Sequence, residues 1–178
     1  MSNDMRNLKI NLEELAGAFD TDFAEMWHYL DLATGEIILV TDETRQQLEE
    51  LLEACAERDT IEVAQVAIQN TDLSDWEKEA LYSAALVEFE YNTRVIEIPR
   101  ADTHEGYKDM EAFIETIISK HLQELLQVAI RGKGAFRRFK DVLERYPQER
   151  EQWFQFREAR LKQRVLDWLK GEGITPLI

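Results

Sequence analysis

Residue types that bind metals or act as nucleophiles are few and scattered in this sequence of 178 residues. It contains three histidines and one cysteine, Cys55, and their spacing matches no zinc motif. His121 and Glu124 can share a helical face, but His121 also continues an apolar stripe, which favours a partly buried structural histidine. Cys55 lies among glutamates that disfavour its thiolate, so we interpret it as a core residue. We therefore expect no metal and no cofactor and identify no catalytic residue, although the many carboxylates leave an enzyme of unknown reaction open.

The most distinctive stretch is basic and covers residues 131–140, which read RGKGAFRRFK. Two glycines precede an expected helix start, where free N–H groups suit an anion. The stretch lacks both the ending of a phosphate loop and a dinucleotide fingerprint. Phe136 and Phe139 keep helical spacing and are expected in the core. The basic residues then form a solvated face, a surface that docks on the chain's acidic half, or a binding site for phosphate or nucleic acid.

A second basic feature follows in the expected last helix, where four arginines and Trp153 are spaced by three or four residues and share one side. We expect Trp153 to be at least partly exposed or covered by arginine stems. Phe154, Leu161, Val165 and Trp168 form the expected core face. Such a surface suits carboxylates, phosphates or cation–π contacts, and pairing with the acidic half is again the alternative. The candidate interaction surface therefore comprises Lys133, Arg137, Arg138, Lys140, Arg150, Trp153, Arg157, Arg160 and Arg164.

The formal net charge of −15 is unevenly distributed. Residues 1–92 hold 5 Lys or Arg against 22 Asp or Glu, a net of −17. Residues 93–178 hold 16 against 14, a net of +2, and within them residues 131–170 hold 12 against 6. The overall excess of acid opposes the approach of a polyanion such as nucleic acid.

Helical periodicity and capping residues predict a mostly helical chain. Helices are expected at about residues 12–19, 42–58, 75–91, 103–132, 135–146 and 148–170. Residues 60–69 alternate like a strand but have the length and alanine content of a helix, which we favour without excluding the strand. Asp102, His104 and Asp109 gather near an expected helix start, and we interpret them as capping residues that complement the helix dipole.

Two stretches predict a small antiparallel sheet. Aromatic and β-branched residues around a turn with Gly35 predict a hairpin over about residues 26–41. A strand is expected at about residues 94–98, before Pro99. The fold class expected is therefore α+β, a mostly helical single domain (residues 1–178) around a small antiparallel sheet.

Targeting signals are not recognised in the sequence. Its first residues are polar and lack the apolar region of a signal peptide, and no run approaches the ~18 apolar residues of a membrane span. A single cysteine supports no internal disulfide framework. We therefore expect a cytoplasmic protein without a membrane partner.

Several strings together resemble one known family. They lie at residues 29–36 (YLDLATGE), 96–99 (IEIP), 106–114 (GYKDMEAFI) and 132–140 (GKGAFRRFK), and are followed by Trp153, Phe156, Arg157, Trp168 and Leu169. They resemble Uncharacterised Protein Family 0158, a group of small bacterial proteins. The resemblance covers most of the chain and is weakest over residues 57–92. It implies a bacterial cytoplasmic setting and an unknown function, and it supplies no site.

These observations favour a non-catalytic interaction or regulatory protein that uses its basic C-terminal helical surface. The partner is an unidentified acidic protein or a second copy of the chain. Nucleic-acid or phosphate binding at the turn of residues 132–140, and an enzyme of unknown reaction, remain alternatives.

Overall fold

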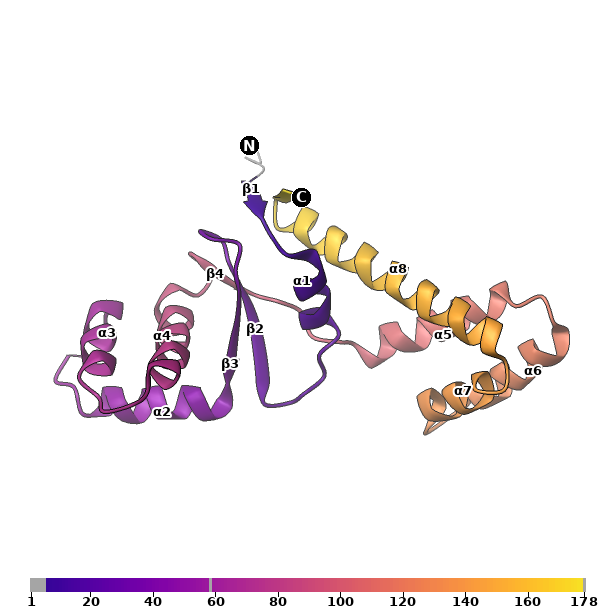
Figure 1. Cartoon of the computed structure of the whole chain (residues 1–178), viewed down its shortest axis with the longest axis horizontal. Coiled ribbons are helices and arrows are strands. Elements are labelled where there is room, and N and C mark those ends of the chain that lie inside the picture. Colours follow the sequence, from indigo (N-terminus) through magenta and orange to yellow (C-terminus); the bar gives the residue numbers. More distant parts are fainter. Residues whose placement is uncertain (1–5, 58, 178) are drawn as a thin grey trace. The chain divides into compact units, whose positions relative to one another are not determined.

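A computed structural model describes residues 6–57 and 59–177. The contacts of the chain divide it into two compact units. Unit 1 comprises Met1–Arg100 with Leu169–Ile178, and unit 2 comprises Ala101–Trp168. Figure 1 labels the elements of both units. The expectation of a single domain stays a prediction.

Unit 1 contains the predicted small sheet. β2 (Met26–Asp31) lies between β3 (Ile37–Thr41) and β4 (Val95–Glu97) and is antiparallel to both. The predicted hairpin and third strand are thereby confirmed, and with eight helices in the described chain the mostly helical α+β class is confirmed as well.

Gly35 closes the hairpin, as the sequence predicts. Its φ of 81° lies in the left-handed region that favours glycine, and its N–H donates to the carbonyl of Asp31 at 2.8 Å. A Cβ at this position would overlap the backbone carbonyl oxygen of Lys9. The turn therefore requires glycine for both its conformation and its close approach to β1 (Arg6–Lys9).

Three helices form the core of unit 1 with the sheet. They are α2 (Asp42–Glu53), α3 (Ile61–Gln69) and α4 (Asp75–Glu90). α2 and α4 pack against the strands, and α3 packs against α2 and α4. Their buried side chains, such as Leu48, Ile68 and Leu81, pack with Tyr29 and Val40 of the hairpin. α1 (Leu12–Phe19) begins after Asn11, whose side chain accepts from the backbone N–H groups of Glu13 and Glu14 as predicted.

The ambiguous segment of residues 60–69 is a helix, α3, and Thr60 caps it by accepting from the N–H of Val63. Ser74 and Glu77 form the predicted capping box of α4. The expected helix over residues 42–58 is too long, because α2 ends at Glu53. Arg58, the expected last residue of that helix, lies outside the described residues.

Two short strands of unit 1 were not expected from the sequence. β1 pairs in parallel with β5 (Ile174–Leu177), with Arg6 opposite Ile174. Each strand has four residues and neither alternates cleanly between apolar and polar side chains. Short strands of this kind carry no local signal, since only their pairing defines them.

Unit 2 consists of α5 (Thr103–Thr116), α6 (Lys120–Ala129), α7 (Ala135–Leu143) and α8 (Pro147–Gly171) up to Trp168. Its core is rich in aromatic side chains. Phe113, Phe139 and Trp153 are buried and contact one another with ring centroids 4.8 to 6.2 Å apart. Such edge-to-face contacts stabilise a core beyond the area that they bury.

The single helix expected over residues 103–132 is wrong. Ile117 has extended backbone angles and ends α5, and the Ser119 hydroxyl then caps α6 by accepting from the N–H of Leu122. His121 is exposed and not part of a buried stripe, because the break resets the helical phase. Within residues 6–57 and 59–177 no helix has the length and apolar character needed to cross a bilayer.

Candidate functional site

The basic stretch singled out in the sequence forms a tight turn between α6 and α7. Gly132 and Gly134 have φ of 73° and 79°, so both use the left-handed conformation that glycine adopts without strain. Gly134 is the N-cap of α7. The turn therefore reverses the chain where the sequence predicts it.

Arg138 binds the end of α6 with its whole guanidinium group. Its Nε donates to the carbonyl of Ala129 at 2.9 Å, and its Nη atoms donate to the carbonyls of Arg131 and Lys133. The last carbonyls of a helix lack partners within the helix, and this side chain supplies them. Arg138 therefore fixes the turn, and its donors face the chain's own backbone and not an external ligand.

Three other basic residues of this region face solvent, and we call Lys133, Arg137 and Lys140 the α7 basic surface. Arg137 has a weak pair with Asp141, with 4.0 Å between Nε and Oδ2 and with 89% and 61% of the two side chains exposed. Lys133 and Lys140 form no ion pair with the part of the chain that the structure describes. Their charge is available to a partner.

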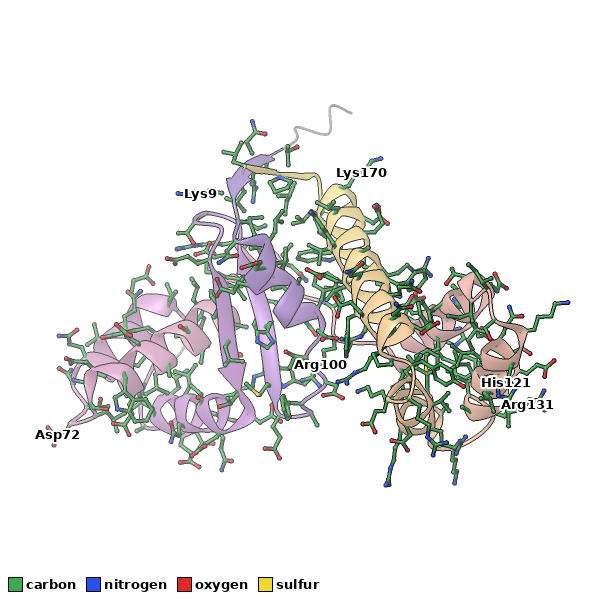
Figure 2. All side chains as sticks on the ribbon, turned by 45° about the vertical axis from the view of Figure 1, so that its right-hand side comes forward. Lys9, Asp72, Arg100, His121, Arg131 and Lys170 are labelled. Atoms are coloured by element: carbon green, nitrogen blue, oxygen red, sulfur yellow. The ribbon has the colours of Figure 1, made fainter. Side chains whose placement is uncertain are left out.

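Phe136 lies beside this surface and is 41% exposed, so the expectation of a core position for it is wrong. Its ring packs against Gly106 of α5, where a Cβ would come within 3.0 Å. Phe139 is buried as expected. Arg131 and His121 also point outward in unit 2 (Figure 2).

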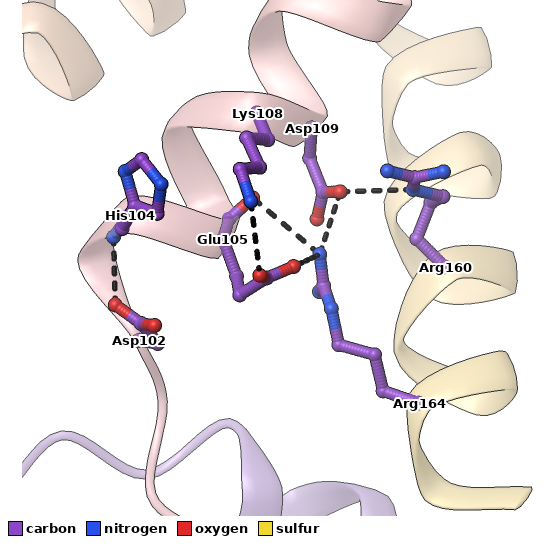
Figure 3. Close-up of polar contacts among 7 residues, drawn as sticks. All are labelled: Asp102, His104, Glu105, Lys108, Asp109, Arg160 and Arg164. Carbon is purple, nitrogen blue, oxygen red and sulfur yellow. Dashed lines mark hydrogen bonds and ion pairs between the residues drawn. The ribbon is translucent and has the colours of Figure 1, made fainter. Parts of the chain in front are cut away.

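A second polar group of unit 2 joins α5 to α8. Asp109 is only 2% exposed and accepts from Arg160 Nε at 2.9 Å and from Arg164 Nη2 at 2.6 Å. Arg164 also contacts the Glu105 carboxylate at 3.4 Å, and Lys108 approaches Glu105 at 3.6 Å. Figure 3 shows the two arginines reaching from α8 toward the carboxylates of α5. We call this group the Asp109 cluster.

The Asp109 cluster corrects two interpretations of the sequence. Asp109 is not a capping residue: Asp102 is the N-cap of α5 and accepts from the N–H of His104, whereas Asp109 lies inside the helix. Arg160 and Arg164 do pair internally, but their carboxylates belong to the second half of the chain and not to the acidic first half. A carboxylate directly beside the buried Met110 was the signal that could have revealed the cluster.

The side of α8 that carries Trp153 faces inward. Trp153 is 6% exposed and Phe154 is 47% exposed, which reverses the expectation for both. The Arg150 guanidinium lies 5.5 Å from the Phe154 ring at the exposed side. Arginines at helical spacing with Trp153 suggested a solvent face, but the buried carboxylate draws Arg160 and Arg164 inward. Arg157 is exposed in its side chain and is engaged in an interaction of its own.

The nine candidate residues thus separate by role. The turn brings together Lys133, Arg137, Arg138 and Lys140, of which Arg138 holds the fold. Arg160 and Arg164 bind Asp109, and Trp153 belongs to the core. Within the described ranges, residues 6–57 and 59–177, no three His, Cys, Asp or Glu side chains are grouped so as to hold a metal ion.

Unit 1 contains a comparable buried carboxylate that the sequence analysis missed. Asp31 is 2% exposed and pairs with Arg94, whose Nε and Nη2 donate at 3.0 and 2.7 Å. Burial acts to raise the pKa of Asp31, but the hydrogen bonds from Arg94 and from the Ala33 N–H outweigh it and lower the pKa below its usual value. The pair links β2 to the residue before β4 and holds the sheet together.

Comparison with known proteins places the chain in a family. The sequence profile of Uncharacterised protein family UPF0158 matches residues 59–178, which is more than half of the chain. The chain belongs to UPF0158. The resemblance seen in the sequence is thereby confirmed, and both the α7 basic surface and the Asp109 cluster lie in the part that the UPF0158 profile matches.

A curated UPF0158 relative matches almost the whole chain. "UPF0158 protein PA5073" of Pseudomonas aeruginosa is 26% identical over 173 residues, which cover 97% of this chain and 88% of the relative. No solved structure matches. Membership of UPF0158 carries no established activity.

Proposed function

We propose that this UPF0158 protein is a non-catalytic binding protein of the bacterial cytoplasm that recognises an acidic protein through the α7 basic surface. The observation that carries the proposal is the exposed charge of Lys133, Arg137 and Lys140. Lys133 and Lys140 have no carboxylate partner in the described chain, and Arg137 has only a long, exposed contact with Asp141. Free cations on a fixed element attract and orient an acidic partner.

The local architecture favours binding because the turn is fixed before any partner arrives. Arg138 ties the turn to the end of α6, and two glycines define its path. A fixed surface loses little backbone freedom on association, which lowers the free-energy cost of binding. The half-exposed ring of Phe136 adds apolar area of the kind that interfaces use.

An acidic protein suits this surface better than nucleic acid does. The chain carries a net charge of −15, so long-range repulsion opposes the approach of a polyanion. A folded protein can present an acidic patch that contacts the α7 basic surface alone.

The test uses the full chain carrying Lys133→Glu, Arg137→Glu and Lys140→Glu together. A matched control reverses three other exposed lysines, Lys9, Lys120 and Lys162, and so changes the net charge equally. Both proteins are immobilised, and the proteins that they retain from a bacterial lysate are identified by mass spectrometry at low and high salt, with and without nuclease. Circular dichroism checks that both variants are folded.

We expect an acidic protein to be retained by the wild type and by the control, to be lost from the α7 variant, and to elute at high salt. Equal retention by the α7 variant contradicts the proposal. Retention that disappears on nuclease treatment assigns the surface to nucleic acid and contradicts it as well.

A further inference from the structure

A second surface, in unit 1, has the opposite charge. α3 and α4 lie side by side (Figure 1). Residues of both helices line an open groove of about 530 Å³. Its walls are formed by Glu62, Gln65, Val66, Gln69 and Tyr82. Val66 is 62% exposed and is the aliphatic side chain among these lining residues.

Tyr82 forms the far wall of the groove and is held in place. Its hydroxyl donates to Gln69 Oε1 at 3.1 Å, across from α4 to α3. The side-chain amides of Gln65 and Gln69 line the groove as well and offer hydrogen bonds to an extended backbone. Val66 and the Tyr82 ring together form a site for one apolar side chain.

The surroundings of the groove are strongly acidic. Residues 59–91 contain eight Asp or Glu and one Lys. The ammonium of that lysine, Lys78, donates to the Gln69 carbonyl at the end of α3. Asp75 and Glu79 precede Tyr82 by seven and three residues, so helical spacing places them on the same side of α4. With Glu62 they leave three carboxylates that form no ion pair with the described chain.

We propose that this groove binds a basic segment of another protein. One apolar side chain of the segment packs on Val66 and Tyr82. Lysines or arginines on either side of it pair with Glu62, Asp75 and Glu79. The charge complementarity decides the occupant, since a neutral or acidic segment would leave these carboxylates unpaired or repelled. The groove lies in unit 1 and is independent of the α7 basic surface of unit 2.

The test measures fluorescence anisotropy of a short labelled peptide in which lysines flank one phenylalanine. Two control peptides replace the phenylalanine by serine or the lysines by glutamates. The variants of the full chain are Glu62→Lys and Val66→Ser. Matched controls are Glu88→Lys, an exposed glutamate on another side of α4, and Val128→Ser, a 60% exposed valine of unit 2.

We expect saturable binding of the lysine–phenylalanine peptide, weakened about fivefold by Glu62→Lys at low salt and about threefold by Val66→Ser. Both control variants and wild type should bind alike, and both control peptides should bind more weakly. Absence of binding, or equal losses in Glu62→Lys and Glu88→Lys, overturns the proposal.

Sedimentation velocity of the same proteins tests whether a second copy of the chain occupies the groove instead. The wild type is expected to sediment as a monomer without the peptide. A concentration-dependent dimer that Val66→Ser or Glu62→Lys abolishes assigns the groove to a second copy of the chain and overturns the proposed occupant. Neither result depends on whether the α7 basic surface binds an acidic protein.

Discussion

Replacing Asp109 by asparagine tests the role of the Asp109 cluster most directly. The substitution keeps the shape of the side chain and one oxygen that can accept, but it removes the charge that attracts Arg160 and Arg164. Both arginines donate to the same carboxylate oxygen of Asp109, at 2.9 and 2.6 Å, and Asp109 is only 2% exposed. The effect should therefore be a loss of stability in unit 2.

The size of the loss follows from the two hydrogen bonds. Each hydrogen bond is charge-assisted and contributes about 1.5 kcal/mol, the low end of the usual range for such bonds. The low end is appropriate because the Arg160 and Arg164 side chains are 45% and 29% exposed. The asparagine oxygen retains one hydrogen bond from an arginine, weakened to about 1 kcal/mol because the acceptor is now neutral. The free energy of unfolding should fall by about 2 kcal/mol.

Urea and thermal unfolding, followed by circular dichroism, measure this change. If unit 2 unfolds by itself, the melting temperature falls by about 8–16 °C, and if the whole chain unfolds together it falls by about 4–8 °C. The matched control is Asp141→Asn, since Asp141 is 61% exposed and 4.0 Å from Arg137, and it should change stability by less than about 0.5 kcal/mol. Equal stabilities of the two variants would refute the assigned role of Asp109.

Three further substitutions extend the test to other elements, two of them with a matched control and the third through its pH dependence. Gly35→Ala should destabilise unit 1 by at least about 2 kcal/mol in urea unfolding, because of its φ and its contact with β1, whereas Gly171→Ala, with open space around it, should be neutral or stabilising. Trp153→Ala should lower the free energy of unfolding by about 3–5 kcal/mol, and Phe154→Ala at the exposed side by less than about 1 kcal/mol; a loss for Trp153→Ala no larger than that for Phe154→Ala would contradict the burial of Trp153. Because the folded-state pKa of Asp31 is lowered, its contribution is complete above the unfolded pKa near 3.8 and is lost as pH falls through the folded value. Asp31→Asn should flatten the stability profile in that acidic range, and an unchanged slope would contradict the Arg94 pairing.

Elements with a local signal were predicted well from the sequence. Asn11 caps α1, Gly35 closes the hairpin, and Ser74 with Glu77 starts α4, because a cap or turn depends on residues within one helical turn of itself. The Gly132–Gly134 turn belongs to the same class. These features need no information from distant parts of the chain.

Features that depend on distant partners were missed or misassigned. The sequence shows the helical periodicity of α8 but not which side of the helix packs against α5. Trp153 was therefore expected at the surface and Phe154 in the core, whereas the structure has them the other way round. Asp109 and Arg160 are 51 residues apart, and nothing local distinguishes a buried paired carboxylate from the many exposed ones. The same reason explains Arg138, whose acceptors are backbone carbonyls that only the folded turn brings together.

The parallel pairing of β1 with β5 has a consequence for synthesis on the ribosome. Arg6 lies opposite Ile174, so all of unit 2 is synthesised before the partner of β1 exists. The β1–β5 pair of unit 1 therefore cannot form until residues 101–168 have been synthesised. During this time β1 presents unpaired backbone groups, and three of its four side chains, Arg6, Asn7 and Lys9, are polar and exposed in the finished protein. Polar and charged side chains on such a waiting strand discourage its pairing with neighbouring nascent chains.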